Sequence, residues 1–301
     1  MRNYGLNLEL EAQHRSETDW LAGAASQAPL FVIPLHEREN YLPKGEVQRG
    51  KEDMMDCSTR ADINILEAYF TYGYKNNKFS PLAKRWLERN GYVNNGKIEF
   101  SDAFNAILSG TTRQGNSLKA PLESIRKDGL IPKKMLPLES SMTWEDYHSP
   151  ERITKEMKYL GSQFAYTFTI NYEIVYVNDF EKWLQTDLIN VAGYAWPQPV
   201  EGVYPRVNYP FNHAFAAYRP KYFIFDNYID SFDGDFIKHL ATDYNFLAYG
   251  YRVFISSERT WTESNYWFVE ILKVLIDLAK DLTELSRKKL GTLLKGLKTP
   301  F

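Results

Sequence analysis

The chain has 301 residues, enough for one large domain or two small ones, and its 36 basic and 38 acidic side chains nearly cancel. No overall field therefore draws the protein to nucleic acid or to acidic lipid, so we expect no nucleic-acid partner. A single cysteine excludes an intramolecular disulfide and a multi-thiolate zinc site, and no sequence motif predicts a cofactor or a metal.

Residues 1–40 have an irregular sequence with one apolar stretch, residues 29–35 (PLFVIPL), which could be a short strand. Prolines at both ends limit the hydrogen bonding of such a strand. We interpret residues 1–40 as a segment that wraps on the following domain or covers its cleft. The chain has no basic start followed by an apolar stretch, so we expect no signal peptide.

The next part of the chain has helical patterns. Apolar residues recur every three to four positions over residues 57–72, which predicts an amphipathic helix that ends at Gly73 and carries Cys57 in its first turn. Further helices are predicted at residues 81–90, 101–109 and 120–128, the last with Gly129 as its stop.

After Lys155 the pattern changes to β-branched and aromatic runs. They predict strands at residues 164–176, 189–196, 214–218, 222–226 and 246–255. A helical half followed by a strand-rich half indicates an α+β fold with two lobes and a cleft between them.

Residues 263–301 have the pattern of a long amphipathic helix, with charged residues largely on the side opposite the apolar ones. Three roles are open for it: core packing, association with a partner or a second copy, and contact with a membrane surface, which four lysines near its end would suit. No run of about 18 uncharged apolar residues occurs, which argues against a transmembrane helix.

Cys57 lies where a thiol is chemically activated, because the dipole and the unpaired N–H groups of a helix N-terminus stabilise a thiolate. Of the five histidines, His213 stands out: it opens an apolar strand, HAFAAY, and the next strand, YFIFDN, ends at Asn227. If these strands are antiparallel, the start of one lies beside the end of the other. Asn227 or its neighbour Asp226 would then meet the imidazole, but not both, because strand alternation puts them on opposite faces.

Four segments of this half resemble the papain family of cysteine peptidases. They are VEGVY at residues 200–204, NHAFAAY at 212–218, YFIFDN at 222–227 and GYRVFI at 250–255. The resemblance implies a papain-like two-lobed fold, with a helical lobe that carries the Cys helix and an antiparallel β-barrel-like lobe that carries His and Asn. It also implies a Cys-His-Asn site, in which Cys57 is the nucleophile, His213 its base and Asn227 the residue that orients the imidazole.

Residues 41–58 and the helix that follows look most like papain-like peptidases encoded by bacteriophages and prophages, and we expect the peptidase domain at residues 41–262. In that family a Gln upstream of the Cys donates to the oxyanion hole together with the Cys backbone N–H, and this role is carried to Gln48. Gln114, Gly115 and Asn116 are similar to the glycine-containing segment whose backbone binds an extended substrate.

The resemblance implies thiol-dependent hydrolysis of peptide or isopeptide bonds in a peptide or protein substrate, in the cytoplasm of the producing cell or in a virion. The alternative is a weak or inactive papain-like domain that serves as a virion structural or assembly protein through its C-terminal helix. A transglutaminase-like acyl transferase would share the Cys and the His, usually with an Asp as third member. Asp56 is a good N-cap for the Cys helix, but its charge next to Cys57 would oppose the thiolate.

Overall fold

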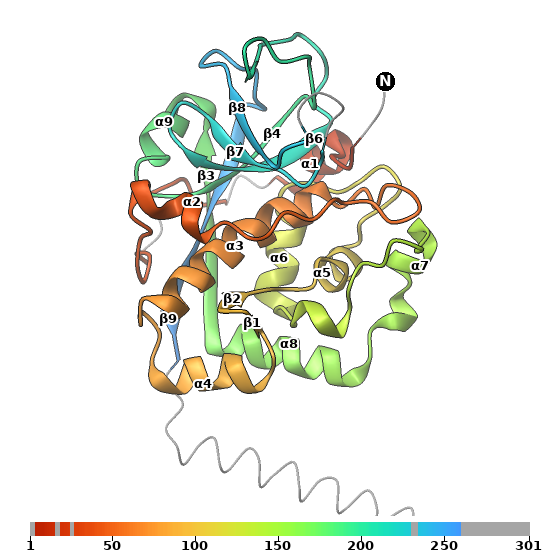
Figure 1. Ribbon diagram of the computed structural model, residues 1–301, viewed down its shortest axis with the longest axis vertical. Coiled ribbons are helices and arrows are strands. Elements are labelled where there is room, and N and C mark those ends of the chain that lie inside the picture. The colour runs from red at the N-terminus through yellow and green to blue at the C-terminus, as the bar shows by residue number, and fades with distance from the viewer. Residues whose placement is uncertain (1–3, 16–18, 25–26, 230–233, 260–301) are drawn as a thin grey trace, which may run out of the picture. The chain divides into compact units, whose positions relative to one another are not determined.

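The computed structural model describes residues 4–15, 19–24, 27–229 and 234–259, and Figure 1 shows their arrangement. They form a helical lobe and a lobe built on one large sheet, so the predicted α+β architecture is confirmed. The amphipathic helix predicted at residues 263–301 lies outside the described residues. Within them, no helix combines the length and the apolar character needed to cross a membrane.

The helices predicted in the first half are confirmed. Ser80 and Ser101 cap two of them, because their hydroxyls accept hydrogen bonds from backbone N–H groups in the first turn. Gly129 ends a third with a φ of 73°, a conformation that glycine adopts without strain. The helices are α1 (Leu8–His14), α2 (Arg38–Tyr41), α3 (Cys57–Lys75), α4 (Pro81–Arg89), α5 (Asp102–Leu108), α6 (Lys119–Asp128), α7 (Trp144–His148), α8 (Lys155–Thr167) and α9 (Phe180–Trp183), with 3-10 turns at Leu35–Glu37, Lys133–Met135, Pro150–Arg152 and Val177–Asp179.

Helix α3 runs through the centre of the described structure and is buried from Cys57 to Gly73 (Figure 1). The predicted stop at Gly73 is wrong, because the helix continues to Lys75. A Cβ at Gly73 would lie 2.6 Å from the Phe79 ring and 2.7 Å from the Phe31 ring. This glycine therefore allows two aromatic rings to pack against the helix.

The second lobe is a seven-stranded sheet with the order β3-β9-β4-β6-β7-β8-β5. Neighbouring strands are antiparallel except β5 and β8, which are parallel. Within the described residues the sheet does not close on itself, so the expected barrel-like lobe is an open sheet. Its strands are β3 (Phe168–Tyr176), β4 (Ile189–Gly193), β5 (Val203–Tyr204), β6 (His213–Arg219), β7 (Phe223–Phe225), β8 (Ile237–Leu240) and β9 (Tyr249–Glu258), and a separate hairpin has β1 (Val93–Asn94) and β2 (Lys97–Ile98).

Three expectations about secondary structure are corrected. The strand predicted from residue 164 begins at Phe168, because Thr154 caps α8 and its apolar residues recur at helical spacing. The sequence predicted no strand at residues 237–240, but these residues form β8, in which buried and partly exposed residues alternate. Residues 29–34 form no strand, although the backbone N–H of Leu30 donates to Ile255 O at 2.7 Å.

Arg38 fastens the N-terminal part of the chain to the sheet lobe. Its guanidinium is fully buried, and its Nη1 donates to three backbone oxygens, those of Leu184 at 2.7 Å and of Asp187 and Tyr218 at 2.9 Å. Burial lowers the pKa of Arg38 from its ordinary value, and the charge on Asp187 partly offsets this decrease. Residues close to position 40 are thus packed into the described structure.

Candidate active site

The N-terminus of α3 meets the start of β6, and this contact brings Cys57 and His213 together. Cys57 is one of the groups that raise the pKa of His213, and the backbone N–H of Ala214 donates to Sγ of Cys57 at 3.3 Å. Both residues are buried, with 1% of Cys57 and none of His213 exposed. The structure thus places a thiol and an imidazole side by side, the pair of groups that nucleophilic acyl transfer requires.

Asp226, not Asn227, is the partner of the imidazole. Nε2 of His213 lies 2.6 Å from Oδ1 of Asp226. The side chain of Asn227 points elsewhere, because its Oδ1 accepts from Asn64 and its Nδ2 donates to the backbone oxygen of Glu46 at 2.7 Å. The antiparallel pairing of β6 with β7 that the sequence predicted is present, but strand alternation gives the position beside His213 to Asp226.

Asp226 is itself held by one hydrogen-bond donor and one buried cation. Nε1 of Trp196 donates to its Oδ2 at 2.9 Å, and Nζ of Lys238 lies 3.9 Å from the same oxygen. Burial disfavours the charged form of His213, but the Asp226 carboxylate and the Cys57 thiol outweigh it and raise the pKa of His213 to about 10. The arrangement favours an imidazolium.

Asp56 precedes Cys57, but its charge is compensated. Its side chain makes no capping bond with α3 and turns instead to Arg60, whose Nε lies 2.9 Å away, and to the hydroxyl of Tyr147, which donates at 2.7 Å. Arg60 is fully buried and also pairs with Asp102 at 3.1 Å. Asp56 thus stands at the N-cap position, as expected, but makes no capping bond, and a buried cation faces the carboxylate that was expected to oppose a thiolate.

Gln48 lies within reach of the same site. The side chain is fully buried, and its Nε2 donates to Asp53 Oδ1 at 3.1 Å and to the backbone oxygen of Tyr4 at 3.0 Å. The Tyr4 oxygen also lies 3.4 Å from Nδ1 of His213. A carbonyl group of the chain itself therefore stands between Gln48 and His213.

The segment around Tyr4 continues along the predicted substrate-binding residues. The backbone N–H of Asn116 donates to Gly5 O at 2.9 Å, and the N–H of Asn7 donates to Asn116 O at 2.9 Å. Leu6 and Asn116 form a parallel bridge. A Cβ at Gly115 would lie 1.9 Å from the Gly5 oxygen, so a glycine is needed for this close approach.

Helix α1 anchors this segment next to the site. The Glu11 carboxylate is 2% exposed, accepts from the backbone N–H of Leu118, which precedes α6, and accepts from the Tyr249 hydroxyl at 2.8 Å. His14, at the end of α1, bonds to the Ser117 hydroxyl through Nδ1 at 2.7 Å. Helix α1 is thus attached to the residues that follow Asn116 and to β9.

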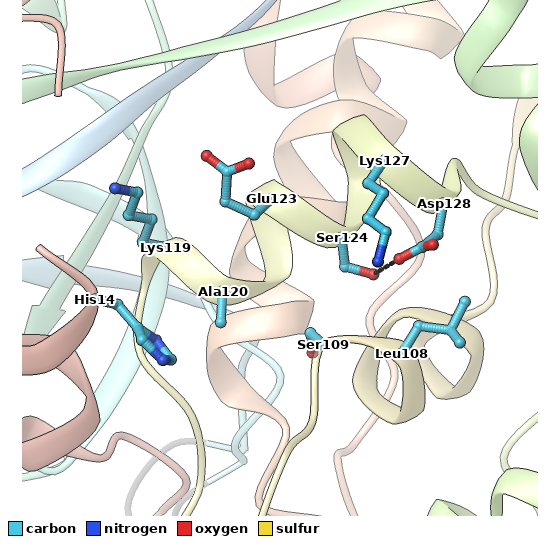
Figure 2. Close-up of a pocket in the computed structure, with 9 residues that line it drawn as sticks. All are labelled: His14, Leu108, Ser109, Lys119, Ala120, Glu123, Ser124, Lys127 and Asp128. Atoms are coloured by element: carbon cyan, nitrogen blue, oxygen red, sulfur yellow. Dashed lines mark hydrogen bonds between the residues drawn. The ribbon is translucent and has the colours of Figure 1, made fainter. Parts of the chain in front are cut away.

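A hollow of about 480 Å³ lies between α1, the end of α5 and α6 (Figure 2). Figure 2 shows His14 on one side, Leu108 and Ser109 on another, and the side chains of α6 between them. Ser109 accepts two bonds from the amide of Asn116. The wall of this hollow therefore also supports the segment on which residues 5–7 lie.

The fold is similar to that of solved cysteine proteases. Xylellain, a cysteine protease from Xylella fastidiosa, matches with a TM-score of 0.51 and 13% identity over 85% of this chain and 96% of its own. The cysteine protease and lectin-like domains of Cwp84, a surface layer associated protein of Clostridium difficile, match with a TM-score of 0.49 and 12% identity over 83% of this chain and 55% of theirs. No protein-family model and no curated protein matches the sequence. The match to xylellain shows that the chain has the fold of papain-like cysteine proteases.

Several residues of the site were not found from the sequence. Trp196 lies between β4 and β6 and Lys238 on β8, the neighbour of β7, and no motif in the sequence indicated that either would reach Asp226. Tyr4 lies in a segment without a periodic pattern. The alternation of β8, which places Lys238 inside, was the one sequence signal that could have revealed a buried cation.

Proposed function

We propose that this protein hydrolyses peptide or isopeptide bonds through a thiol nucleophile. The observation that carries the proposal is the contact of Cys57, in the first turn of α3, with His213, whose ring is held by Asp226. These groups supply a nucleophile, an acid–base group and an orienting anion, which together suffice for nucleophilic acyl transfer.

The reaction has two steps. The Cys57 thiolate attacks the carbonyl carbon of the substrate, a C–S bond forms, and the amine leaves with a proton from His213 as the C–N bond breaks. In the second step His213 takes a proton from water, and the resulting hydroxide attacks the thioester. The carboxylic acid leaves as the C–S bond breaks, and the thiolate and imidazolium are restored.

Gln48 is proposed to stabilise the negative oxygen of the tetrahedral intermediate together with the backbone N–H of Cys57. The support is that its Nε2 already donates to a carbonyl oxygen, that of Tyr4, which also lies close to His213. A substrate carbonyl in that place would receive the same bond. Asp226 takes the orienting role that the sequence resemblance gave to Asn227.

The N-terminal segment is proposed to inhibit the enzyme by covering its own site. In the described form Tyr4 lies against Gln48 and His213, and residues 5–7 occupy the backbone of Asn116. A substrate that needs these groups must displace the segment. The burial of both Cys57 and His213 supports this proposal.

An extended peptide is the proposed substrate class. The backbone N–H and C=O of Asn116 pair with an extended stretch, and Gly115 leaves room for its backbone. The bacteriophage or prophage setting is proposed on the sequence resemblance of residues 41–58 alone.

Acyl transfer to an amine is a second candidate function, because Asp226 as the third member suits a transglutaminase-like enzyme. The two functions share the thioester and differ in whether water or an amine releases it. A labelled primary amine added to the reaction separates them: incorporation into glutamine-containing peptides indicates transfer, and cleaved peptides without incorporation indicate hydrolysis.

The experiment that tests the proposal is digestion of a proteome-derived peptide library, with new termini identified by mass spectrometry. We expect cleavage by the full chain, more cleavage by the variant Glu11→Ala, in which the covering segment is loosened, and none by Cys57→Ala in either background. Equal numbers of new termini with and without Cys57 would contradict a thiol peptidase.

A further inference from the structure

Lys238 is a buried cation beside the proposed site. Its side chain is 0% exposed, and its Nζ lies 3.9 Å from Oδ2 of Asp226. The same Nζ donates to the backbone oxygens of Tyr228 at 3.1 Å and Asp235 at 2.6 Å. A buried ammonium group requires an opposite charge, and Asp226 supplies it.

The carboxylate of Asp226 is consequently shared between two cations. Its Oδ1 faces His213, and its Oδ2 faces Lys238 and accepts from Trp196. A carboxylate acting alone would hold the proton on the imidazolium strongly, whereas the proposed reaction needs that proton to pass to the leaving amine. A neutral amide would orient the ring without this cost, but the amide of Asn227 is bonded elsewhere.

We infer that Lys238 is a positioning residue of the site: paired with Asp226, it shares the charge of the carboxylate, so that Asp226 holds the imidazolium proton of His213 less strongly than an unpaired carboxylate would. The effect of Lys238 on turnover rests on the proposed function. The charge pairing itself is testable without turnover.

Other titratable groups also face His213, and the test leaves them unchanged. They come from α3, from the loop before it, from the N-terminal segment and from the residues after β7. Apart from Asp226, they are Cys57, Asp53, Tyr4 and Tyr228.

The test is a titration of the His213 ring in the full chain by NMR, with histidine labelled with carbon-13 at Cε1. The resonance is assigned by its loss in His213→Ala. The background is the parent chain, in which Asp226 keeps its charge and compensates the ammonium of Lys238, so the comparison measures how far Lys238 weakens the hold of the carboxylate on the imidazolium proton. Lys238→Met should raise the midpoint by at least about one pH unit.

Two further variants make the result specific. Lys238→Arg in the same background keeps the positive charge and should leave the midpoint at the parent value, and Lys158→Met, at an exposed position of α8, should leave it unchanged. Should the methionine variant fail to fold, Lys238→Gln carries the same expectation. A midpoint that does not move when Lys238 loses its charge, or that moves as far with arginine, overturns the inference. An unreactive Cys57 would refute the proposed function and leave this titration intact.

Discussion

Glu11 is the anchor of α1, and its replacement by alanine is expected to uncover Cys57. Its carboxylate accepts two hydrogen bonds, from the backbone N–H of Leu118 and from the hydroxyl of Tyr249, in a position that is 2% exposed. Alanine removes both bonds and leaves the two donors without their acceptor. The segment that runs from Tyr4 to α1 should then leave the site more often.

The size of the effect follows from these bonds. Each hydrogen bond to a charged group contributes about 1.5–3 kcal/mol. Burial raises the pKa of Glu11, which means that the desolvated carboxylate returns part of this gain. We therefore expect a net loss of about 1.5–3 kcal/mol in docking, or roughly a tenfold to hundredfold increase in the open fraction.

The assay is the rate at which an epoxide probe labels Cys57 at pH 7 in the full chain. The matched control is Glu9→Ala, because Glu9 lies on the same helix but is exposed. We expect labelling of Glu11→Ala to be roughly tenfold to hundredfold faster than that of the parent chain, and Glu9→Ala to match the parent. Equal rates in Glu11→Ala and Glu9→Ala would refute the covering role of the segment.

Three further predictions concern other parts of the structure. Gln48→Ala should lower the rate of peptide cleavage by about 10²–10³, and an unchanged rate would remove Gln48 from the oxyanion hole. Arg38→Ala should lower the free energy of unfolding in urea by about 3–5 kcal/mol, because four buried carbonyl groups lose their donor, whereas Arg219→Ala at a 41% exposed side chain should cost less than about 1 kcal/mol. The pKa of His213 is raised from 6.5 to about 10 in the folded chain, so its stabilising effect is complete below pH 6.5 and is lost as the pH rises through 10. The stability difference between the parent chain and His213→Ala should shrink over that range, and a difference that stays constant would contradict the paired imidazolium.

The sequence predicted well those elements whose local pattern agrees with their final environment. Helix α3 has both a helical period and a fully buried position, and β6 and β7 are apolar runs separated by a short turn that contains Pro220. These elements carry Cys57 and His213, which is why the two residues could be paired before the fold was known. Where local patterns were ambiguous, as in the aromatic run of α8, the prediction failed.

The finer geometry of the site depends on contacts that local patterns do not encode. The alternation of side chains along a strand predicted that only one of Asp226 and Asn227 could face His213. Which of the two does so depends on how the strand is rotated in the sheet. The Tyr4 carbonyl is held at the site by α1, whose Glu11 accepts a hydrogen bond from Leu118 at the start of α6. Contacts of this kind between residues far apart in the sequence decided which polar groups surround the imidazole.

The most direct test of the central claim is the pH dependence of Cys57 labelling by an epoxide probe, measured in Glu11→Ala with and without the further change His213→Ala. The account predicts labelling that persists well below pH 7 when His213 is present and collapses there when it is absent. Labelling that rises only near pH 8.5, and equally in both proteins, is the behaviour of an ordinary thiol and would contradict a thiol peptidase.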